Sequence, residues 1–364
     1  MLVEDSAVIR GFIGRALEAD PGVIIVASVA DGQMAVDAIQ RAAPDVVVLD
    51  IEMPVMDGLT ALPKLLAASP RSNVIMASTL TKRNADISLR ALSAGAADYI
   101  AKPSSAGDLA GADDFKVELL RKVKALAAAA RGRDGAAPAR DAGPASPAAR
   151  PAGVTTLYPG ARITTRPMPA VFNPRVIAVG SSTGGPQALM EVLAHLRGVR
   201  QPVLVTQHMP ATFTTILAEH ITRQAGLPTV EGADGMPLQA GRCHLAPGGF
   251  HMTIEAGAPQ PVIRLNEGPL INYVRPAVDP MMESIVEVYR SGILSVILTG
   301  MGKDGLDGCR ATADAGGVVI AQDEASSVVW GMPGAVATDG IANAILPLRK
   351  IGPTLRDLAI RTAA

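Results

Sequence analysis

The sequence has little cysteine, few aromatic residues and no excess of charge of either sign. Cys243 and Cys309 are its only cysteines, and their spacing matches no metal-binding motif, which fits a reducing cytoplasm. Its 33 basic and 34 acidic residues balance, so no basic field predicts nucleic-acid binding. No apolar run approaches the ~18 residues of a membrane span, and the acidic N-terminus lacks a long apolar segment, so no signal peptide is expected. These absences predict a cytoplasmic protein without membrane insertion or a nucleic-acid partner.

The chain length of 364 residues exceeds one typical domain and suits two. A segment rich in Ala, Pro, Gly and Arg, residues 126–170, has little to bury and is expected to form an extended linker. Its arginines could bind an acidic partner, but a solvated tether is favoured. In the flanking segments, 1–125 and 171–364, apolar strands alternate with helical patterns. This alternation predicts two α/β domains with mainly parallel sheets.

A glycine-rich turn, Gly-Ser-Ser-Thr-Gly-Gly at 180–185, follows the first apolar run of the second domain. A strand is predicted at 176–179 and a helix at 188–196, so the motif Gly-x-Ser-x-Gly joins a strand to a helix. This geometry raises the central hydroxyl, that of Ser182, above the sheet beside the first amides of the helix. Ser182 could then be a nucleophile with an oxyanion hole nearby, or the turn could bind an anion or be purely structural.

Two further polar residues follow apolar runs of the second domain. The strand predicted at 202–207 precedes His208, and the strand predicted at 293–299 runs into a glycine-rich turn that holds Asp304. The carboxyl ends of parallel strands lie along one edge of a sheet, so Ser182, His208 and Asp304 are expected to converge. An imidazole can take the serine proton while a carboxylate holds its tautomer and stabilises its charged form. Each residue alone could be structural, but together they favour a serine hydrolase.

The first domain has a second set of polar residues at strand ends: Glu4, Asp5, Asp50, Ser78 and Lys102. Carboxylates so close together repel one another unless a hard cation joins them, and Mg²⁺ prefers such oxygen ligands. Asp50 could then attack a phosphoryl donor and carry an aspartyl phosphate. Ser78 could donate to the phosphoryl oxygens and Lys102 could pair with them. Any one of these residues is commonly a solvated charge, but the set is specific.

The first predicted strand is unusually short. Only Met1, Leu2 and Val3 precede Glu4, whereas strands commonly have about five residues. A shortened central strand would leave backbone groups of its neighbours unpaired and remove apolar side chains from the core. We therefore expect either that the natural chain starts several residues upstream, which we favour, or that the first domain is weakened and its metal site misaligned.

The second domain resembles the catalytic domain of the chemotaxis protein-glutamate methylesterases, the CheB family. The resembling motifs are GSSTGG at 180–185, QHMP at 207–210, RPAVD at 275–279, LTGMGKDG at 298–305 and QDEAS at 322–326. This resemblance implies a doubly wound α/β fold and hydrolysis of glutamyl γ-methyl esters on chemoreceptors, with release of methanol. It also implies deamidation of certain receptor glutamines, and no cofactor for ester hydrolysis.

By the same resemblance, Ser182 is the nucleophile, His208 the base and Asp304 its orienting acid, while Ser181 is a neighbour. The backbone of Met301 is expected to form part of the oxyanion hole. The other residues expected to line the site or contact substrate are Thr183, His251, Asn272 and Arg275.

Residues 1 to about 105 resemble the receiver domain of response regulators, most strongly in DIEMPVMDG at 50–58. The resemblance implies a flavodoxin-like (βα)5 fold and phosphorylation of Asp50 by a chemotaxis histidine kinase. Ser78 and Tyr99 are expected to be the switch pair, acting with Lys102. Mg²⁺ is expected to bind Glu4, Asp5, Asp50 and the backbone carbonyl of Glu52.

We interpret the sequence as a phosphorylatable receiver that controls a serine esterase at cytoplasmic receptor arrays. Without phosphate, the receiver is expected to block large substrates, and phosphorylation to shift that equilibrium. One alternative is a receiver-coupled esterase that acts on another protein or a small ester. Another is a non-catalytic two-component adaptor. Release of methanol from methylated receptors would distinguish these alternatives.

Overall fold

The computed structural model describes residues 1–79, 81–102, 109–133, 158 and 160–360, and the chain divides into two compact units. The first unit is Met1–Pro159 and the second unit is Gly160–Ala364. The linker predicted at 126–170 overlaps both: helix α5 continues to Arg133, and the Arg166 N–H donates to the Ala342 carbonyl oxygen at 2.8 Å within the second unit. Residues 134–157 and 159 of that linker lie outside the described residues.

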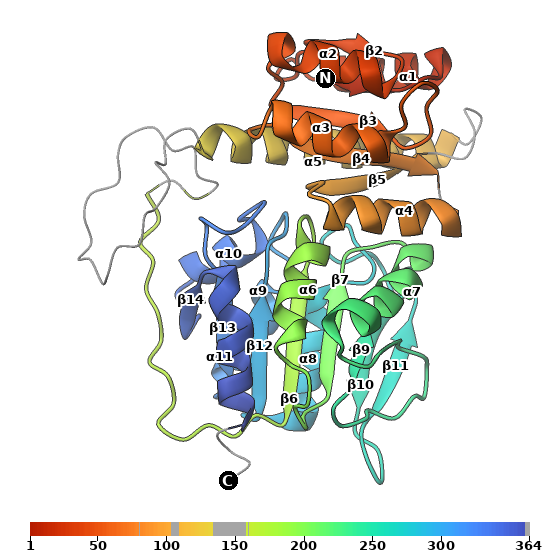
Figure 1. Cartoon of the computed structure of the whole chain (residues 1–364). Coiled ribbons are helices and arrows are strands. Elements are labelled where there is room, and N and C mark those ends of the chain that lie inside the picture. The colour runs from red at the N-terminus through yellow and green to blue at the C-terminus, as the bar shows by residue number, and fades with distance from the viewer. Residues whose placement is uncertain (80, 103–108, 134–157, 159, 361–364) are drawn as a thin grey trace. The chain divides into compact units, whose positions relative to one another are not determined.

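The first unit contains a five-stranded sheet in the order β2-β1-β3-β4-β5, in which every pairing is parallel (Figure 1). Its strands are β1 (Leu2–Val3), β2 (Ser28–Val29), β3 (Val46–Asp50), β4 (Asn73–Thr79) and β5 (Asp98–Lys102). The strand β3 is buried throughout, as its uninterrupted apolar run requires in a sheet covered on both faces. The strands of this sheet all end toward the edge that holds Asp50.

The first four helices of the first unit begin at side chains that accept a hydrogen bond from the first turn. These caps are Ser6, Asp31, Asp57 and Thr81, which accept from the N–H groups of Ile9, Met34, Thr60 and Asn84 respectively. The helices are α1 (Ala7–Glu18), α2 (Gly32–Ala42), α3 (Gly58–Ala68), α4 (Lys82–Ser93) and α5 (Leu109–Arg133). The short polar residues before each apolar repeat therefore fix where these helices start.

The strand β1 has only two residues, yet it pairs with β2 on one side and β3 on the other. The Met1 amino group donates to the Val46 carbonyl oxygen at 2.8 Å, and the Val48 N–H donates to the Met1 carbonyl oxygen at 2.9 Å. Burial lowers the pKa of the Met1 amino group to about 6. The short strand thus still joins the two halves of the sheet beside Glu4.

The second unit contains a seven-stranded sheet in the order β14-β13-β12-β6-β7-β9-β8, again with parallel pairings throughout. Its strands are β6 (Val176–Ser181), β7 (Val203–Gln207), β8 (Thr229–Glu231), β9 (Cys243–Leu245), β12 (Ile293–Ile297), β13 (Val318–Gln322) and β14 (Ala344–Leu346). An antiparallel hairpin, β10 (His251–Glu255) with β11 (Val262–Asn266), lies outside this sheet. The strand order reverses between β6 and β12, where α/β proteins commonly bind ligands.

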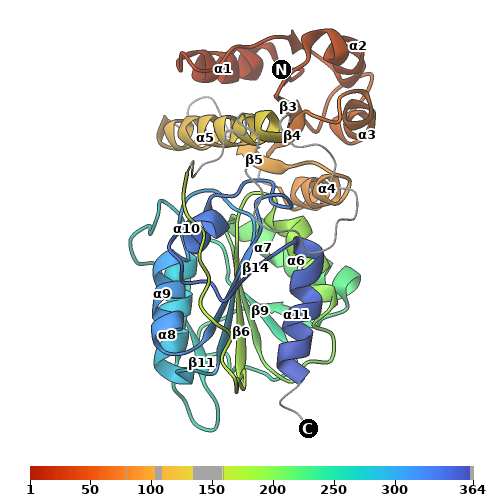
Figure 2. The ribbon, with the colours of Figure 1, turned by 90° about the vertical axis from the view of Figure 1, so that its left-hand side faces the viewer.

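Helices cover both faces of this sheet, with α8 and α9 on one face and α6 and α11 on the other (Figure 2). The helical elements are α6 (Gly185–Ala194), α7 (Ala211–His220), the π-helical turn η1 (Ile221–Ala225), α8 (Val278–Tyr289), α9 (Leu306–Asp314), α10 (Met332–Thr338) and α11 (Leu348–Ile360). Apolar side chains of α8 pack against the sheet through Val278, Met281 and Ile285, which are fully buried. The predicted α/β class, with mainly parallel sheets, is confirmed.

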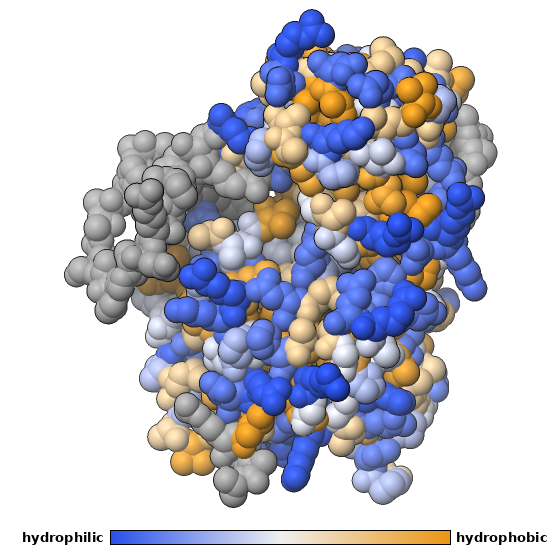
Figure 3. Space-filling model, in the orientation of Figure 1, coloured by the Kyte–Doolittle hydropathy of each residue, from blue (hydrophilic) through white to orange (hydrophobic). Residues whose placement is uncertain are grey.

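Hydrophobic residues lie scattered among hydrophilic ones on the face drawn in Figure 3, as on ordinary protein surfaces. Within the described residues, no helix combines the length and apolar character that crossing a membrane requires.

We expect His244 in β9 to make the second unit sensitive to acid. Burial, together with the charge of Arg242, lowers the pKa of His244 to about 4 from 6.5. An unfolded chain therefore binds a proton at pH values where the folded chain does not. The contribution of neutral His244 to the free energy of unfolding is complete above about pH 6.5. It is lost as the pH falls toward about 4, which lowers the free energy of unfolding by about 3 kcal/mol in total.

The test is urea unfolding followed by the fluorescence of Trp330, the only tryptophan, which is buried in the second unit. Its midpoint should fall between about pH 7.5 and about pH 5 in the unchanged chain and fall less in His244→Gln. Gln is chosen because His244 Nε2 accepts from the Gln239 N–H at 3.1 Å, and an amide oxygen can replace it. The exposed His195→Gln is the control. Equal pH dependence in both variants would contradict this role for His244.

Candidate functional site

The predicted Gly-x-Ser-x-Gly turn lies at the carboxyl end of β6, where the strand order reverses. The Ser182 N–H donates to the Thr299 carbonyl oxygen at 3.0 Å, and the Ser182 carbonyl oxygen accepts from the Gly185 N–H at 2.7 Å. Gly184 has a φ of +74°, and a Cβ on Gly185 would clash with Gln207 Oε1. The turn therefore requires glycine at both positions, and its contacts hold Ser182 at a fixed place above the sheet.

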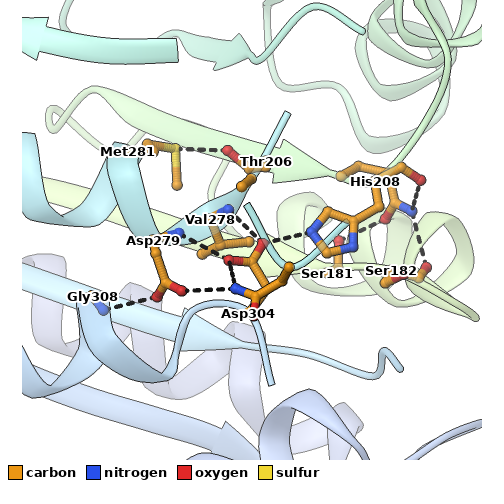
Figure 4. Close-up of polar contacts among 12 residues, drawn as sticks. Ser181, Ser182, Thr206, His208, Val278, Asp279, Met281, Asp304 and Gly308 are labelled. Carbon is orange, nitrogen blue, oxygen red and sulfur yellow. Dashed lines mark hydrogen bonds and ion pairs between the residues drawn. The ribbon is translucent and has the colours of Figure 1, made fainter. Parts of the chain in front are cut away.

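The two serines of this turn have different surroundings. Ser181 is fully buried, and its Oγ donates to Gln207 Oε1 at 2.7 Å. Gln207 Nε2 donates in turn to the carbonyl oxygens of Ser182, at 2.9 Å, and His208, at 3.2 Å (Figure 4). Ser182 itself is only partly buried. A nucleophile must be reachable by substrate, so the accessible Ser182 suits that role and Ser181 suits a structural one.

His208 follows β7 and Asp304 lies in the turn after β12, so both side chains reach the edge where β6 ends (Figure 4). His208 Nε2 lies 2.7 Å from Asp304 Oδ2, which leaves Nδ1 as the ring nitrogen on the side away from Asp304. A histidine held in this way can accept a proton at Nδ1, while the carboxylate stabilises the imidazolium that forms. The side chains are 10% and 1% exposed, so water screens this interaction little.

The carboxylate of Asp304 is held by the N-terminus of α8. The N–H groups of Val278 and Asp279 donate to it at 2.6 and 3.2 Å, and Asn272 Nδ2 donates at 3.2 Å. Burial raises the pKa of Asp304, but the hydrogen bonds from His208 and Val278 outweigh it, and the pKa lies below its usual value. The positive end of the helix dipole favours the same charged form. Asp304 therefore stays ionised beside His208.

The turn after β12 also holds Met301. A Cβ on Gly300 would lie 2.9 Å from Ser182 Cβ, so the backbone that leads into Met301 lies against the serine. Thr183 is buried, and its carbonyl oxygen accepts from Thr299 Oγ1 at 2.9 Å, which ties the serine turn to the end of β12. An oxyanion hole needs backbone N–H groups about 2.7–3.1 Å from the position that the substrate oxyanion will occupy. The role predicted for Met301 stays a prediction, and this placement is compatible with it.

His251, predicted to line the site, is buried and uses both ring nitrogens within the protein. Its Nε2 donates to the Pro269 carbonyl oxygen at 2.9 Å, and its Nδ1 accepts from the Ala277 N–H at 3.2 Å. Ala277 directly precedes α8. This arrangement joins the loop before α8 to the start of that helix, which itself holds Asp304.

The loop between β11 and α8 carries the other two predicted substrate residues. Arg275 Nη1 donates to the carbonyl oxygens of Glu267 and Gly268, at 2.8 and 2.7 Å, and so braces its own loop. Asn272 has a φ of +52°, an uncommon conformation for a residue with a side chain, and its amide faces Asp279 and Asp304. Substrate contacts by these residues stay predictions.

The first unit contains an acidic pocket formed by Glu4, Asp5 and Asp50, whose carboxylate oxygens lie within 4.8 Å of one another. Lys102 Nζ donates to Glu4 Oε2 at 3.0 Å and to Asp50 Oδ1 at 2.6 Å. Burial raises the pKa of Glu4, as does the charge of Asp50, and burial likewise raises the pKa of Asp50. Such crowded charge, with hard oxygen donors, fits a divalent cation such as Mg²⁺. Glu52 lies two residues beyond Asp50, in the loop after β3.

The predicted switch residues Ser78 and Tyr99 are both buried. The Ser78 hydroxyl lies 3.1 Å from that of Ser88 in α4. Lys122 of α5, which the sequence did not suggest, donates to the Tyr99 carbonyl oxygen at 2.6 Å and lies over its ring at 5.0 Å. Tyr99 is therefore held from α5. The available signal in the sequence was a lysine between apolar residues of that helix.

Comparison with known proteins bears on both units. The family model for CheB methylesterase matches residues 177–355, and the model for the response regulator receiver domain matches residues 1–112. A protein-glutamate methylesterase/protein-glutamine glutaminase of Azospirillum brasilense is 60% identical over 370 residues, which cover 100% of this chain and 93% of that protein. The chain belongs to the CheB methylesterase family.

Other relatives agree with this family membership. A protein of Rhodospirillum centenum is 58% identical, and the match covers 100% of this chain and 94% of that protein. It is named protein-glutamate methylesterase/protein-glutamine glutaminase of group 2 operon. The crystal structure of the Thermotoga maritima CheB methylesterase catalytic domain matches with a TM-score of 0.50 and 39% identity, covering 51% of this chain and 99% of that one. The family predicted from the five motifs is therefore confirmed.

Asp279 lies at this CheB-family site, although no role was predicted for it from the sequence. It stands in the motif RPAVD and is 6% exposed, which is unusual for an acid. Its carboxylate oxygens lie close to the Asn272 amide and the Gly308 N–H. A charged residue among apolar ones at the start of a helix was the available signal.

Proposed function

We propose that the chain is a phosphorylation-regulated serine hydrolase that removes methyl groups from glutamyl γ-methyl esters of chemoreceptors. The same site is proposed to deamidate specific receptor glutamines. The observation that carries this proposal is the hydrogen bond between His208 and Asp304 at the edge of the sheet where β6 ends and Ser182 follows it. The names and the near-complete coverage of the relatives support it.

The first half of the reaction forms an acyl-enzyme. Ser182 Oγ attacks the ester carbonyl carbon while His208 takes the hydroxyl proton at Nδ1, and Asp304 stabilises the imidazolium. The oxygen of the tetrahedral intermediate is proposed to accept a hydrogen bond from the Met301 N–H, since the preceding residue, Gly300, lies against Ser182. The intermediate then collapses, its bond to the methoxy oxygen breaks, and His208 returns the proton to give methanol.

The second half of the reaction restores the serine. Water attacks the acyl carbon while His208 takes one of its protons, and collapse of the second intermediate returns that proton to Ser182 Oγ. The product is a receptor glutamate. With a glutamine side chain, the same steps release ammonia in place of methanol. Both reactions balance with water as the only co-reactant, and the protons pass through the side chains described.

The first unit is proposed to regulate this reaction through a phosphoryl group on Asp50. Mg²⁺, when bound by Glu4, Asp5, Asp50 and the Glu52 carbonyl, neutralises negative charge of the pocket and of the phosphoryl oxygens. Lys102 is already within hydrogen-bond distance of Asp50 and can pair with a phosphoryl oxygen. Ser78, at the end of the neighbouring strand, can donate to another. A change at Ser78 and Tyr99 then relays the charge added at Asp50.

The partners in this proposal are methyl-accepting chemoreceptors as substrate and a chemotaxis histidine kinase as phosphodonor. Because receptors carry the substrate, the protein is proposed to work in the cytoplasm at receptor arrays.

The test is incubation of the chain with receptor-containing membranes whose glutamyl methyl esters carry a radiolabel. We expect labelled methanol to appear as volatile counts, and the rate to rise severalfold when an acyl phosphate and Mg²⁺ are added. A matched incubation without protein measures spontaneous ester hydrolysis. Label that stays on the receptors would contradict the esterase and favour the adaptor alternative. Release from small methyl esters but not from receptors would favour a different esterase.

A further inference from the structure

Asp279 lies directly behind the acid of the proposed active site. It is the second residue of α8, and its backbone N–H is one of the two helix amides that hold Asp304. Its side chain turns toward α9, where Oδ1 accepts from the Gly308 N–H at 2.9 Å (Figure 4). A second carboxyl group is thereby fixed next to the first, in a place from which water is largely excluded.

The two carboxyl groups share one amide. Asn272 Nδ2 lies 3.2 Å from Asp279 Oδ2 and 3.2 Å from Asp304 Oδ1, so its two hydrogens point to different acids. The left-handed backbone conformation of Asn272 places the amide there. A side-chain NH₂ group carries two hydrogens and can therefore donate to both acids at once. The arrangement therefore couples the position of Asp279 to that of Asp304.

Two buried carboxyl groups this close do not both ionise readily, and one of them keeps a proton. Burial raises the pKa of Asp279 to about 7, and the charge of Asp304 contributes in the same direction. The ionised form is stabilised more at Asp304, because Asp304 accepts hydrogen bonds from His208 and from two helix amides. Below about pH 7, Asp279 thus holds the proton and Asp304 the charge.

We propose that Asp279 is a positioning residue of the esterase, which as a neutral carboxylic acid keeps Asp304 aligned on His208. This proposal rests on the proposed function. When Asp279 loses its proton, a second negative charge stands beside Asp304. That charge favours the protonated imidazole, which cannot take a proton from Ser182. The low-pH limb of the pH–rate profile of the esterase therefore depends on the protonation of Asp279 as well as on that of His208.

The titratable groups around Asp279 come from each element packed against it. Asp304 lies in the turn before α9, and Asp307 and Cys309 lie in the first turn of that helix. Glu283 lies one turn after Asp279 in α8. His208 faces Asp304 from the end of β7, and His251 reaches the start of α8 through the Ala277 N–H. The acids among these groups raise the cost of a second charge at Asp279.

The first measurement is the pH profile of kcat/KM for methanol release from methylated receptors by the full chain and by Asp279→Asn. The amide can still accept from Gly308 and can donate toward Asp304, as the protonated acid does. We expect its low-pH limb to be steeper and to lie roughly half a unit to one unit lower in pH, because only one group then titrates. The plateau rate should fall as well, because the new amide nitrogen cannot accept from Asn272 Nδ2 as Asp279 Oδ2 does.

The matched control is Asp314→Asn, which makes the same change at the exposed end of α9. Its profile should superimpose on that of the unchanged chain. A lowered kcat/KM in Asp279→Asn that is equal at all pH values would show a structural role only and would overturn the proposal. Tryptophan fluorescence of Trp330 verifies that each variant is folded.

The second measurement does not need activity. Infrared difference spectra of the unchanged chain should show a carboxylic acid C=O band that disappears as the pH rises through about 7 and that Asp279→Asn lacks. Absence of such a band would overturn the proposal. If the band titrates but no methanol is released, the proton-holding acid stands and the proposed function fails. If methanol is released and the band is absent, the function stands and the role of Asp279 fails.

Discussion

Replacing Ser182 with alanine is expected to lower the rate of methanol release by roughly 10⁴-fold to 10⁶-fold, because the reaction then has no nucleophile. The fold should survive, since the contacts of the turn are made by the backbone of Ser182 and by Gly185. Receptor binding should also survive, so the variant should still compete with the unchanged chain for methylated receptors. The measurement is volatile radiolabel released per enzyme, at equal protein concentration.

The matched variant is Ser181→Ala, one residue earlier in the same turn. Its hydroxyl is buried on Gln207, and its loss leaves a buried oxygen of Gln207 without that donor, at a cost of about 1–3 kcal/mol in stability. Because Gln207 also holds the carbonyl oxygens of Ser182 and His208, the rate should fall, but by no more than about tenfold. An inactive Ser181→Ala beside an active Ser182→Ala would reverse the assignment of the nucleophile.

Replacing Asp50 with asparagine is expected to remove both phosphate incorporation and the severalfold stimulation of receptor demethylation. The amide lacks the carboxylate oxygen that would attack the phosphoryl donor, and it removes one charge from the acidic pocket with Glu4 and Asp5. Phosphate incorporation is followed with a labelled acyl phosphate and Mg²⁺, and stimulation by release of labelled methanol. The control is Asp37→Asn, an exposed acid of α2, which should keep both properties.

A fragment of the second unit extends this test. It should begin at Gly160, because Arg166 and Pro167 are bonded to Ala342 and Asn343 and would be lost from a later start. If the first unit restrains the second, the fragment should release methanol faster than the unphosphorylated full chain and should not respond to acyl phosphate. A fragment no faster than the full chain would argue against restraint. Stimulation that persists in Asp50→Asn would place the phosphoryl group elsewhere.

The architecture was largely readable from the sequence, because strands buried on both faces leave uninterrupted apolar runs. The run ending at Asp50 and the run ending before Ser182 were therefore found as β3 and β6. Parallel strands share an edge, and this rule alone predicted that Ser182, His208 and Asp304 converge. The five sequence motifs then predicted the family. Helix α5 continues to Arg133, inside the segment predicted to be a linker from residue 126, since alanine suits a helix and a linker equally well.

The antiparallel hairpin of β10 and β11 was not predicted, and neither was the order of the strands. Short alternating segments carry a weak signal, and strand order depends on contacts between residues far apart in the sequence. The same reason applies to Lys122, which reaches Tyr99 from α5 across 23 residues.

Within the active site, the sequence determined which residue types stand at the strand ends, because local apolar patterns and glycine turns fix those positions. Only the tertiary structure decided that His208 meets Asp304 through Nε2, and that both nitrogens of His251 bind backbone groups. It also decided that Asp279, 25 residues before Asp304, lies against it. Side-chain direction and burial arise from the packing of α8 on the sheet. A carboxyl group's protonation follows from its neighbours in space, which the order of residues does not contain.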